Sequence, residues 1–339
     1  MRVLHRVAAK FNHTLTLSEG LLGGIAIHKT GQAMPDETAT LASAADATLL
    51  GAVGLPEFDN APPSQRPERG LLGIRAVLGV YANLRPVRTY KALIDSSPLK
   101  NDRVAGTDMI IVRELTGGIY YGTPRGIEGS GDTERAVNTM TYTRAEIARI
   151  GRMAFHLARQ RRKKVSSVDK SNVLECSQLW RKVMVEVAAG FPDVKLEHVL
   201  VDNCAMQLVL NPTQFDVVVT ENMFGDILSD EGAVLAGSIG MLPSASIGEK
   251  KPSGAWVGLY EPVHGSAPDI AGQNKANPLG AIGSAAAMLE YSFGLTAEAA
   301  AVNRAIEEVL NSGRVTADLK PAGPPATTEQ VGEAVCAAI

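Results

Sequence analysis

Two aspartates four positions apart, Asp226 and Asp230, flank a short apolar run in the segment 224–230, FGDILSD. The periodicity around them predicts a helix, on which side chains four apart have Cβ atoms about 5–6 Å from each other. Partly buried, at an effective dielectric near 20, two such charges repel by roughly 3 kcal/mol. A buried pair therefore favours a hard cation such as Mg²⁺ or Mn²⁺, with Asp202 as a candidate third ligand. The alternative is that Asp226 caps the helix and Asp230 is solvated.

Cationic side chains suited to a small polyanionic ligand occur at Arg75, Arg85 and Arg113. Arginine binds carboxylates bidentately, although each of these residues could instead be a structural ion-pair partner. Lys170 could act as a base if it is desolvated beside a metal, and Tyr120 could act as an acid. Taken singly, Lys170 also fits a strand-end lysine and Tyr120 a packed loop aromatic.

The segment 261–278, EPVHGSAPDIAGQNKANP, is rich in Gly, Pro and Asn and is predicted to be a loop. Its small residues would let the backbone approach a ligand closely. Asp269 could accept hydrogen bonds from ribose hydroxyls, as acidic residues do in NAD sites. The sequence contains no GxGxxG and no P-loop. An ordinary irregular loop is the alternative.

Composition narrows the class of protein. The 339 residues are 45% hydrophobic and 20% charged, with a formal net charge of −3, which is typical of a soluble globular protein of two domains. This charge gives no general attraction to nucleic acid or to an anionic membrane. Three cysteines without a CxxC pair fit a reducing, cytoplasmic compartment. No run of about 18 apolar residues predicts a membrane span.

Extended apolar runs alternate with helical patterns, which predicts an α/β architecture with largely parallel strands covered by helices. Polar residues end most of the runs, where ligands gather in open α/β sheets. The basic cluster 161–164 is predicted to stabilise a helix C-terminus or to stay solvated. The basic N-terminus could be a transit peptide, but apolar residues at helical spacing favour a surface helix. The predicted strands are 47–53, 108–115, 164–170, 196–203 and 215–222, and the N-terminal stripe is Val3, Val7 and Phe11.

Eight segments in order carry a family resemblance: RPERGLLGIR, ANLRP, VRELTGGIYYG, SVDKSNVLE, VDNCAMQL, TENMFGDILSDE, MLPSAS and EPVHGSAPDIAG. From Gly20 onward the chain resembles the isocitrate/isopropylmalate dehydrogenase family of β-decarboxylating dehydrogenases. The resemblance implies two α/β domains of mostly parallel sheet with helices on both faces. A discontinuous cofactor-side domain would comprise 1–81 and 237–339. A central domain, 82–236, would carry the dimer interface and the metal and catalytic residues.

The motifs are most similar to those of isopropylmalate-oxidising members. The resemblance implies NAD-dependent oxidative decarboxylation of 3-isopropylmalate to 2-oxo-4-methylpentanoate and CO₂, in leucine biosynthesis. It also implies a cytoplasmic homodimer with shared active sites. D-malate, tartrate and homoisocitrate are alternative substrates, and a catalytically silent subunit is an alternative of a different class.

The same resemblance implies roles for the candidate residues. Arg75, Arg85 and Arg113 would hold the malate carboxylates. Asp226 and Asp230 from one subunit and Asp202 from the other would hold Mg²⁺ or Mn²⁺. Lys170, contributed across the dimer, would help to remove the hydroxyl proton, and Tyr120 would protonate the carbon that CO₂ leaves.

The resemblance also implies which residues determine substrate specificity and which bind the cofactor. Leu71 and Leu72, with Val173 across the dimer, would contact the isopropyl group and disfavour a third carboxylate. A carboxylate at Asp269, followed by Ile270, would favour NAD by repelling a 2′-phosphate. Glu68 would lie near the nicotinamide ribose, and the adenosine site would be lined by His264, Gly265, Ser266, Ala267 and Asn277.

The chain departs from the family at its beginning. Relatives start with a strand and a glycine-rich turn of the type GDGIGPE, whereas this sequence starts in the helix that follows. We expect the sheet of the terminal domain to lack one strand. Stability or activity is therefore expected to be lower than in a relative that has the strand.

Overall fold

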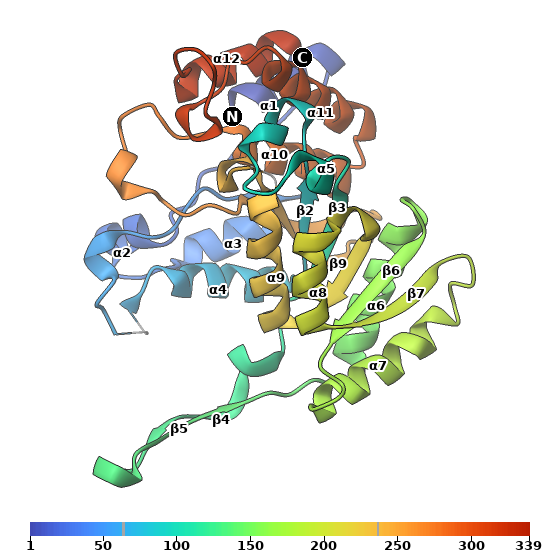
Figure 1. Cartoon of the computed structure of the whole chain (residues 1–339). Coiled ribbons are helices and arrows are strands. Elements are labelled where there is room, and N and C mark those ends of the chain that lie inside the picture. The colour runs from blue at the N-terminus through green and yellow to red at the C-terminus, as the bar shows by residue number, and fades with distance from the viewer. Residues whose placement is uncertain (63–64, 236) are drawn as a thin grey trace. The chain divides into compact units, whose positions relative to one another are not determined.

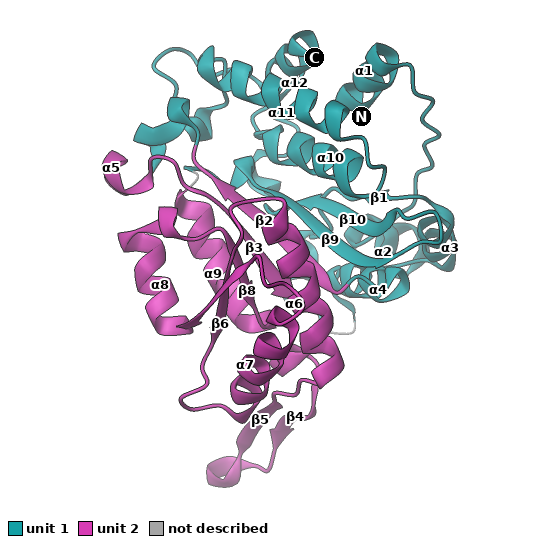
Figure 2. Cartoon of the chain, turned by 90° about the vertical axis from the view of Figure 1, so that its right-hand side faces the viewer, with its two compact units in different colours: residues 1–80, 90–98, 236–339 teal, residues 81–89, 99–235 magenta. Residues whose placement is uncertain are grey.

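The computed structural model describes residues 1–62, 65–235 and 237–339 (Figure 1). The chain divides into two compact units (Figure 2). Unit 1 comprises Met1–Val80, Tyr90–Pro98 and Ala236–Ile339, and unit 2 comprises Tyr81–Thr89 and Leu99–Leu235. The short segment 90–98 therefore belongs with the terminal parts of the chain, which the sequence did not suggest.

Unit 2 is built on strands in the order β2-β3-β8-β6-β7. β3, β8, β6 and β7 run parallel, and β2 pairs antiparallel with β3. Because Arg113 of β3 is level with Thr220 of β8, and Thr220 with Val168 of β6, the carboxyl ends of three strands meet at one edge. The strands are β2 (Ala82–Arg88), β3 (Asp108–Glu114), β6 (Lys164–Asp169), β7 (Lys195–Leu200) and β8 (Val217–Thr220).

Helices cover both faces of these strands (Figure 2). α6 (Arg144–Arg159) packs beside α7 (Glu175–Ala188) on one face, and α8 (Val201–Leu210) beside α9 (Asn222–Leu235) on the other. The start of α6 is a capping box in which Thr143 and Glu146 satisfy each other's backbone N–H groups. A two-stranded arm, β4 (Gly122–Glu128) and β5 (Arg135–Thr139), extends from this unit (Figure 1). The remaining elements of the unit are α5 (Asn101–Val104), η4 (Gly118–Tyr120), η5 (Gly131–Thr133) and η6 (Pro212–Gln214).

Unit 1 contains the strands β1 (Thr48–Leu49), β10 (Trp256–Pro262) and β9 (Pro243–Lys250), in that order. β1 is parallel to β10 and β9 is antiparallel to it. Ile74 of α4 (Glu68–Leu78) and Ala42 of α3 (Asp36–Ala44) share a buried cluster with Leu259 of β10. α10 (Leu279–Tyr291) also packs on β9 and β10. The unit further contains α1 (Arg2–Phe11), α2 (Gly24–Thr30), α11 (Thr296–Asn311), α12 (Thr328–Ala338), η1 (Pro56–Phe58), η3 (Lys91–Ser96), η7 (Ile239–Met241), η8 (Pro268–Ile270) and η9 (Ala317–Leu319).

Most of the predicted strands are present, but some details differ. The run 47–53 forms only the two residues of β1, and the run 196–203 turns into α8 after Leu200, so Asp202 lies in the first turn of a helix. The segment 61–70 lies partly outside the described residues, and α4 begins within it at Glu68. Within the basic cluster, Arg161 is partly buried and pairs with both Asp108 and Asp216, whereas Arg162 and Lys163 are exposed. The N-terminal helix is confirmed, with Val3 and Val7 buried.

Candidate active site

Asp226 and Arg113 form the centre of a charged cluster in unit 2. Arg113 is at the end of β3 and is only 7% exposed. Its Nη1 donates to Oδ1 of Asp226, on the second turn of α9. The two elements approach closely because Gly225 faces Arg113: a Cβ at this glycine would lie 2.7 Å from Arg113 Cβ. A buried guanidinium is thus held against the helix that carries two of the three predicted metal ligands.

Arg85 brings the second aspartate into this cluster. It lies on β2 and contacts α9 through Nη1, which donates to Ser229 Oγ at 2.6 Å and to Asp230 Oδ1 at 3.0 Å. Its Nη2 is 3.9 Å from Asp226 Oδ1. Of the three predicted arginines, Arg85 and Arg113 therefore meet both predicted aspartates within unit 2. The reading of Asp226 as a helix cap is wrong, since Glu221 accepts from the first N–H groups of α9.

Tyr120 reaches the same carboxylate from η4. Its hydroxyl donates to Asp226 Oδ2 at 3.0 Å, and its ring lies 5.9 Å from the guanidinium carbon of Arg113. Desolvation raises the pKa of the Tyr120 hydroxyl, and the negative charge of Asp226 raises it further. The phenol is therefore kept protonated, which is the form that an acid needs.

Lys170 and Asp202 form a second group in unit 2. Lys170 follows β6, and its Nζ lies 3.0 Å from Asp202 Oδ2 at the start of α8. The hydrogen bond from Lys170 lowers the pKa of the Asp202 carboxyl. Asp202 is a well-exposed carboxylate, with 59% of its side chain accessible. Both groups are thus open to another molecule.

The donor set of Asp226 and Asp230 fits a hard cation. Both side chains offer carboxylate oxygens, with 35% and 67% of the side chain accessible. Mg²⁺ is commonly held by one or two carboxylates together with water and substrate oxygens. Within the described residues, no group of three or more His, Cys, Asp or Glu side chains is arranged to hold a metal. These two aspartates would therefore supply part of a ligand set rather than all of it.

In unit 1, α4 presents the other predicted substrate residues. Glu68, Leu71, Leu72 and Arg75 are spaced three, four and seven positions apart, which places them along one side of the helix. Leu72 is 41% exposed, whereas Leu71 packs partly against the buried cluster of Leu259. Arg75 Nη2 donates to Glu261 Oε1 at 2.8 Å, and its Nε is buried without a hydrogen-bond partner.

The predicted cofactor loop also lies in unit 1 and fits a ligand such as NAD. His264 holds its orientation through Nδ1 and the Gly265 carbonyl oxygen, while its Nε2 is buried and unpartnered. Ser266 Oγ donates to the Gly54 carbonyl oxygen at 2.7 Å, and a Cβ at Gly54 would lie 4.0 Å from Glu68 Oε1. An orphaned polar atom beside exposed backbone is a place where a ligand group gains a hydrogen bond. Asp269, in η8, is exposed.

Two other residues of the predicted adenosine site have structural features of their own. Asn277 is 7% exposed, and its amide donates to Asp318 Oδ2 while its oxygen caps the N-terminus of α10 at Leu279. Any contact of Asn277 with a ligand is therefore left to its main chain. Ala267 adopts the left-handed conformation, with φ of 43°, which is strained for a residue other than glycine. Ile270 ends η8 and is partly buried.

Sequence reasoning missed the buried polar residues behind the cluster. Glu114, Glu221 and Asn222 are 0%, 3% and 1% exposed, and Tyr142 is 8% exposed. For Glu114, Glu221 and Asn222 the available signal was their position at the ends of the apolar runs of β3 and β8, which could not separate a helix cap from a support. Desolvation raises the pKa of both carboxyls, although each accepts backbone hydrogen bonds that oppose the shift.

Comparison with known proteins shows which family the chain belongs to. Among the described residues, no helix combines the length and apolar character needed to cross a membrane. The chain is 60% identical over 323 residues to a 3-isopropylmalate dehydrogenase of Geobacillus kaustophilus, which spans 95% of this chain and 86% of that protein. It is 55% identical over 323 residues to a 3-isopropylmalate dehydrogenase of Aquifex aeolicus, with 95% and 87% covered.

A solved structure of similar fold is the isocitrate dehydrogenase of Methylococcus capsulatus, with a TM-score of 0.85, 33% identity, and coverage of 99% of this chain and 94% of that one. The β-decarboxylating dehydrogenase of Thermococcus kodakarensis matches with a TM-score of 0.77 at 32% identity, over 99% and 91% of the two chains. The family model for isocitrate/isopropylmalate dehydrogenases matches residues 1–335. The chain belongs to the isocitrate/isopropylmalate dehydrogenase family.

Proposed function

We propose that the chain is an NAD-dependent 3-isopropylmalate dehydrogenase, which oxidises and decarboxylates its substrate to 2-oxo-4-methylpentanoate and CO₂ in leucine biosynthesis. The relatives at 55–60% identity carry this name. The observation that carries the proposal is the cluster of Arg85, Arg113, Tyr120, Asp226 and Asp230 in unit 2. This cluster brings together two guanidinium groups that can bind anions, a protonated phenol, and carboxylate oxygens that can bind a hard cation.

Substrate binding would exchange charged partners within this cluster. In the free protein the guanidinium groups of Arg85 and Arg113 neutralise Asp230 and Asp226. When bound, a divalent cation would supply Lewis-acid polarisation of the substrate oxygens, and the nicotinamide would supply the hydride acceptor. With a cation on the aspartates, the arginines are freed to bind the substrate carboxylates. Arg75 of unit 1 would bind a carboxylate as well.

Proton transfers fall to Lys170 and Tyr120. Lys170 would accept the proton of the substrate hydroxyl as the C2 hydrogen leaves as hydride. Loss of CO₂ then leaves an electron pair on the adjacent carbon, and Tyr120 would donate the proton that this carbon needs. The raised pKa of Tyr120 keeps that proton in place until the step occurs.

The proposed preference for an isopropyl group rests on apolar side chains. Leu72 of α4 is 41% exposed and Val173 is 61% exposed, so both are available to a branched alkyl group. A third carboxylate placed against such side chains would lose its hydration without gaining a partner. The exposed carboxylate of Asp269 favours NAD over NADP through repulsion of a 2′-phosphate.

A homodimer with shared active sites is supported by the outer face of α8 and α9. The large apolar residues Met206, Val209, Leu210, Ile227 and Val234 on these helices are between 42% and 60% exposed. Large apolar side chains exposed on neighbouring helices are typical of an interaction site. A second copy is the occupant we propose, because α8 also carries Asp202, the ligand that the aspartates of α9 lack. The proposed dimer would be cytoplasmic.

Steady-state kinetics test the proposal. NADH formation would be measured with 3-isopropylmalate, D-malate, tartrate and homoisocitrate, each with Mg²⁺ or Mn²⁺ and with NAD or NADP. We expect kcat/KM to be highest for 3-isopropylmalate with NAD. A higher kcat/KM for one of the other acids would make that acid the substrate in place of 3-isopropylmalate. No turnover of any acid would favour a catalytically silent subunit.

A further inference from the structure

We propose that Asn222 is a positioning residue that holds Arg113 and the turn leading to Tyr120 in register with each other. This role rests on the proposed function, because it concerns the residues placed around the substrate there. Asn222 is the first residue of α9 and is 1% exposed. It lies behind the charged cluster and would not touch the substrate.

Each polar group of the Asn222 side chain has a partner. Oδ1 accepts from Arg113 Nε at 2.9 Å. Nδ2 donates to the Leu115 carbonyl oxygen at 3.3 Å and to the Gly117 carbonyl oxygen at 3.1 Å. A reversed amide would set NH₂ against a guanidinium and an oxygen against two carbonyls, so the chemistry of the partners fixes the orientation. One amide thereby links a substrate-binding arginine to the chain that precedes Tyr120.

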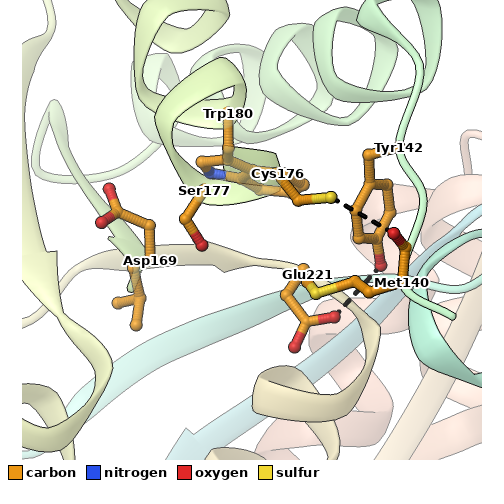
Figure 3. A pocket seen from close by; sticks show the side chains of 8 residues that line it. Met140, Tyr142, Asp169, Cys176, Ser177, Trp180 and Glu221 are labelled. Atoms are coloured by element: carbon orange, nitrogen blue, oxygen red, sulfur yellow. Dashed lines mark hydrogen bonds between the residues drawn. The ribbon is translucent and has the colours of Figure 1, made fainter. Parts of the chain in front are cut away.

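The backbone of Asn222 is itself held by Tyr142 and Glu221. The Tyr142 hydroxyl accepts from Asn222 N at 2.9 Å and donates to Glu221 Oε2 at 3.2 Å. Figure 3 shows this hydroxyl pointing at the Glu221 carboxylate across a small pocket. Glu221 in turn accepts from Phe224 N at 2.7 Å and from Met223 N at 3.1 Å. These hydrogen bonds hold the first residues of α9 and therefore fix the position of the Asn222 side-chain amide.

The turn that receives the amide is closely packed. Glu114 Oε2 accepts from Thr116 N and Gly117 N at 2.9 and 2.7 Å. Gly118 has φ of +79°, and a Cβ there would lie 2.5 Å from Tyr142 Oη. The two carbonyl oxygens of Leu115 and Gly117 point the other way, toward Asn222. Loss of its NH₂ would leave both without that donor in a buried place, which is costly enough to displace the turn.

Two substitutions at Asn222 separate the two contacts. Asn222→Asp keeps an acceptor for Arg113 and removes the donors to the turn, whereas Asn222→Ala removes both. Val217→Ala is the control, because Val217 is fully buried at the opposite end of β8 and does not touch the cluster. The kcat and KM of Val217→Ala show how far a loss of core packing alone changes the two constants.

We expect Asn222→Asp to lower kcat at least tenfold with KM for 3-isopropylmalate within threefold of the unmodified chain. Asn222→Ala is expected to lower kcat similarly and also to raise KM at least tenfold, since Arg113 loses its anchor. Val217→Ala should change both constants less than twofold while it is folded. The inference is overturned if both Asn222 variants give the constants of the Val217→Ala control.

Hydrogen exchange gives a second readout that does not depend on the substrate. In Asn222→Asp the amides of 116–118 should exchange at least tenfold faster, with those of β3 unchanged. This result would support the inference even if the unmodified chain turned over none of the acids, an outcome that defeats only the proposed function. Unchanged exchange at 116–118 would overturn the inference whatever the activity.

Discussion

The carboxylate of Asp226 has neighbours that each carry a positive charge or a proton. Arg113 contacts one oxygen and Tyr120 the other, and Arg85 lies 3.9 Å away. In the free protein, Asp226 is thus held beside positive charges that offset its repulsion of Asp230. A cation that binds here has to compete with the arginines, so substrate carboxylates that draw the arginines away should strengthen its binding.

Replacement of this carboxylate tests its role as a metal ligand. Asp226→Asn keeps the shape of the side chain but removes the negative charge that a cation needs. We expect kcat/KM to fall by at least about 100-fold and the Mg²⁺ concentration for half-maximal rate to rise by at least about 10-fold. Rates would be measured over a Mg²⁺ titration. The control is Asp102→Asn on exposed α5, which should leave both values unchanged; an equal change in the two variants would contradict the assignment.

A second prediction at this scale concerns the buried carboxyl of Glu221. Burial raises its folded-state pKa above the ordinary value of 4.5, despite the hydrogen bonds that it accepts. The folded protein then holds this proton more tightly than the unfolded chain. The associated stability is present below pH 4.5 and is lost as the pH rises through the folded-state pKa. Glu221→Gln does not titrate in either state.

We therefore expect the free energy of unfolding of Glu221→Gln, relative to the unmodified chain, to rise as the pH increases from 4.5 toward neutrality. The rise should approach about 1.4 kcal/mol for each unit by which the pKa is raised. Urea unfolding across this pH range measures it. Glu134→Gln, at an exposed position, serves as the control. If the difference in free energy of unfolding between Glu221→Gln and the unmodified chain does not change with pH, burial does not raise the pKa of Glu221.

Pattern reasoning identified the aspartates, arginines and tyrosine of the cluster but not their pairing. The type and spacing of Asp226 and Asp230 suggest a cation, since two like charges on one helix face need compensation. In the structure, Arg85 of β2 and Arg113 of β3 compensate these charges. Both arginines lie far from α9 in the sequence, so their pairing with the aspartates could not be predicted from spacing. Asn222 and Glu221 were visible only as polar residues after a strand, because a single amide or carboxylate has many possible uses.

At the scale of elements, α9 differs from its predicted form in an informative way. The sequence suggests one apolar stripe, yet Phe224 and Leu228 are buried whereas Ile227 and Val234 are 60% and 52% exposed. Hydrophobicity shows that a residue avoids water but not which surface covers it. One face of α9 packs on β2 and β3, and Ile227 and Val234 lie on a face that the proposed second copy would cover. The parallel core of unit 2 was easier to predict, because β3 and β8 contain continuous apolar runs.

The contact between α9 and β3 depends on Gly225. A Cβ at this position would meet Arg113 Cβ and Cγ at 2.7 Å, so Gly225→Ala must displace either the arginine or the helix. We expect a loss of about 1–3 kcal/mol of stability from overpacking and a fall in kcat/KM of at least about tenfold. Thermal unfolding and steady-state kinetics would measure the two effects.

Gly232, two turns further along α9, provides the matched control. A Cβ there would meet the end of the Val87 side chain at 3.0 Å. A terminal methyl group adjusts more easily than the Cβ and Cγ of a packed arginine. Both substitutions raise helix propensity by a similar amount. Gly232→Ala should therefore retain most of the activity. Equal losses in the two variants would show that the position of Arg113 is not the critical contact.

At the scale of the whole molecule, the proposed sharing of ligands between two copies has a quantitative consequence. If Asp226 of one copy works with Asp202 of the other, Asp226→Asn and Asp202→Asn each inactivate every site of their own homodimer. A mixed dimer of the two variants has one site with both changes and one site with neither. The intact site should work, because it contains all of its ligands.

When the two variants are co-expressed in equal amounts, random pairing makes about half of the dimers mixed, each with one intact site of two. We expect about a quarter of the unmodified activity from the mixture, against almost none from either variant alone. Separate tags on the two variants allow the mixed dimer to be purified and its activity per site to be measured. If the mixture is no more active than its components, the three aspartates belong to one chain or the protein does not pair through α8 and α9. Mixing the variants after each has assembled should give less activity than co-expression, because the recovery then depends on exchange of whole subunits.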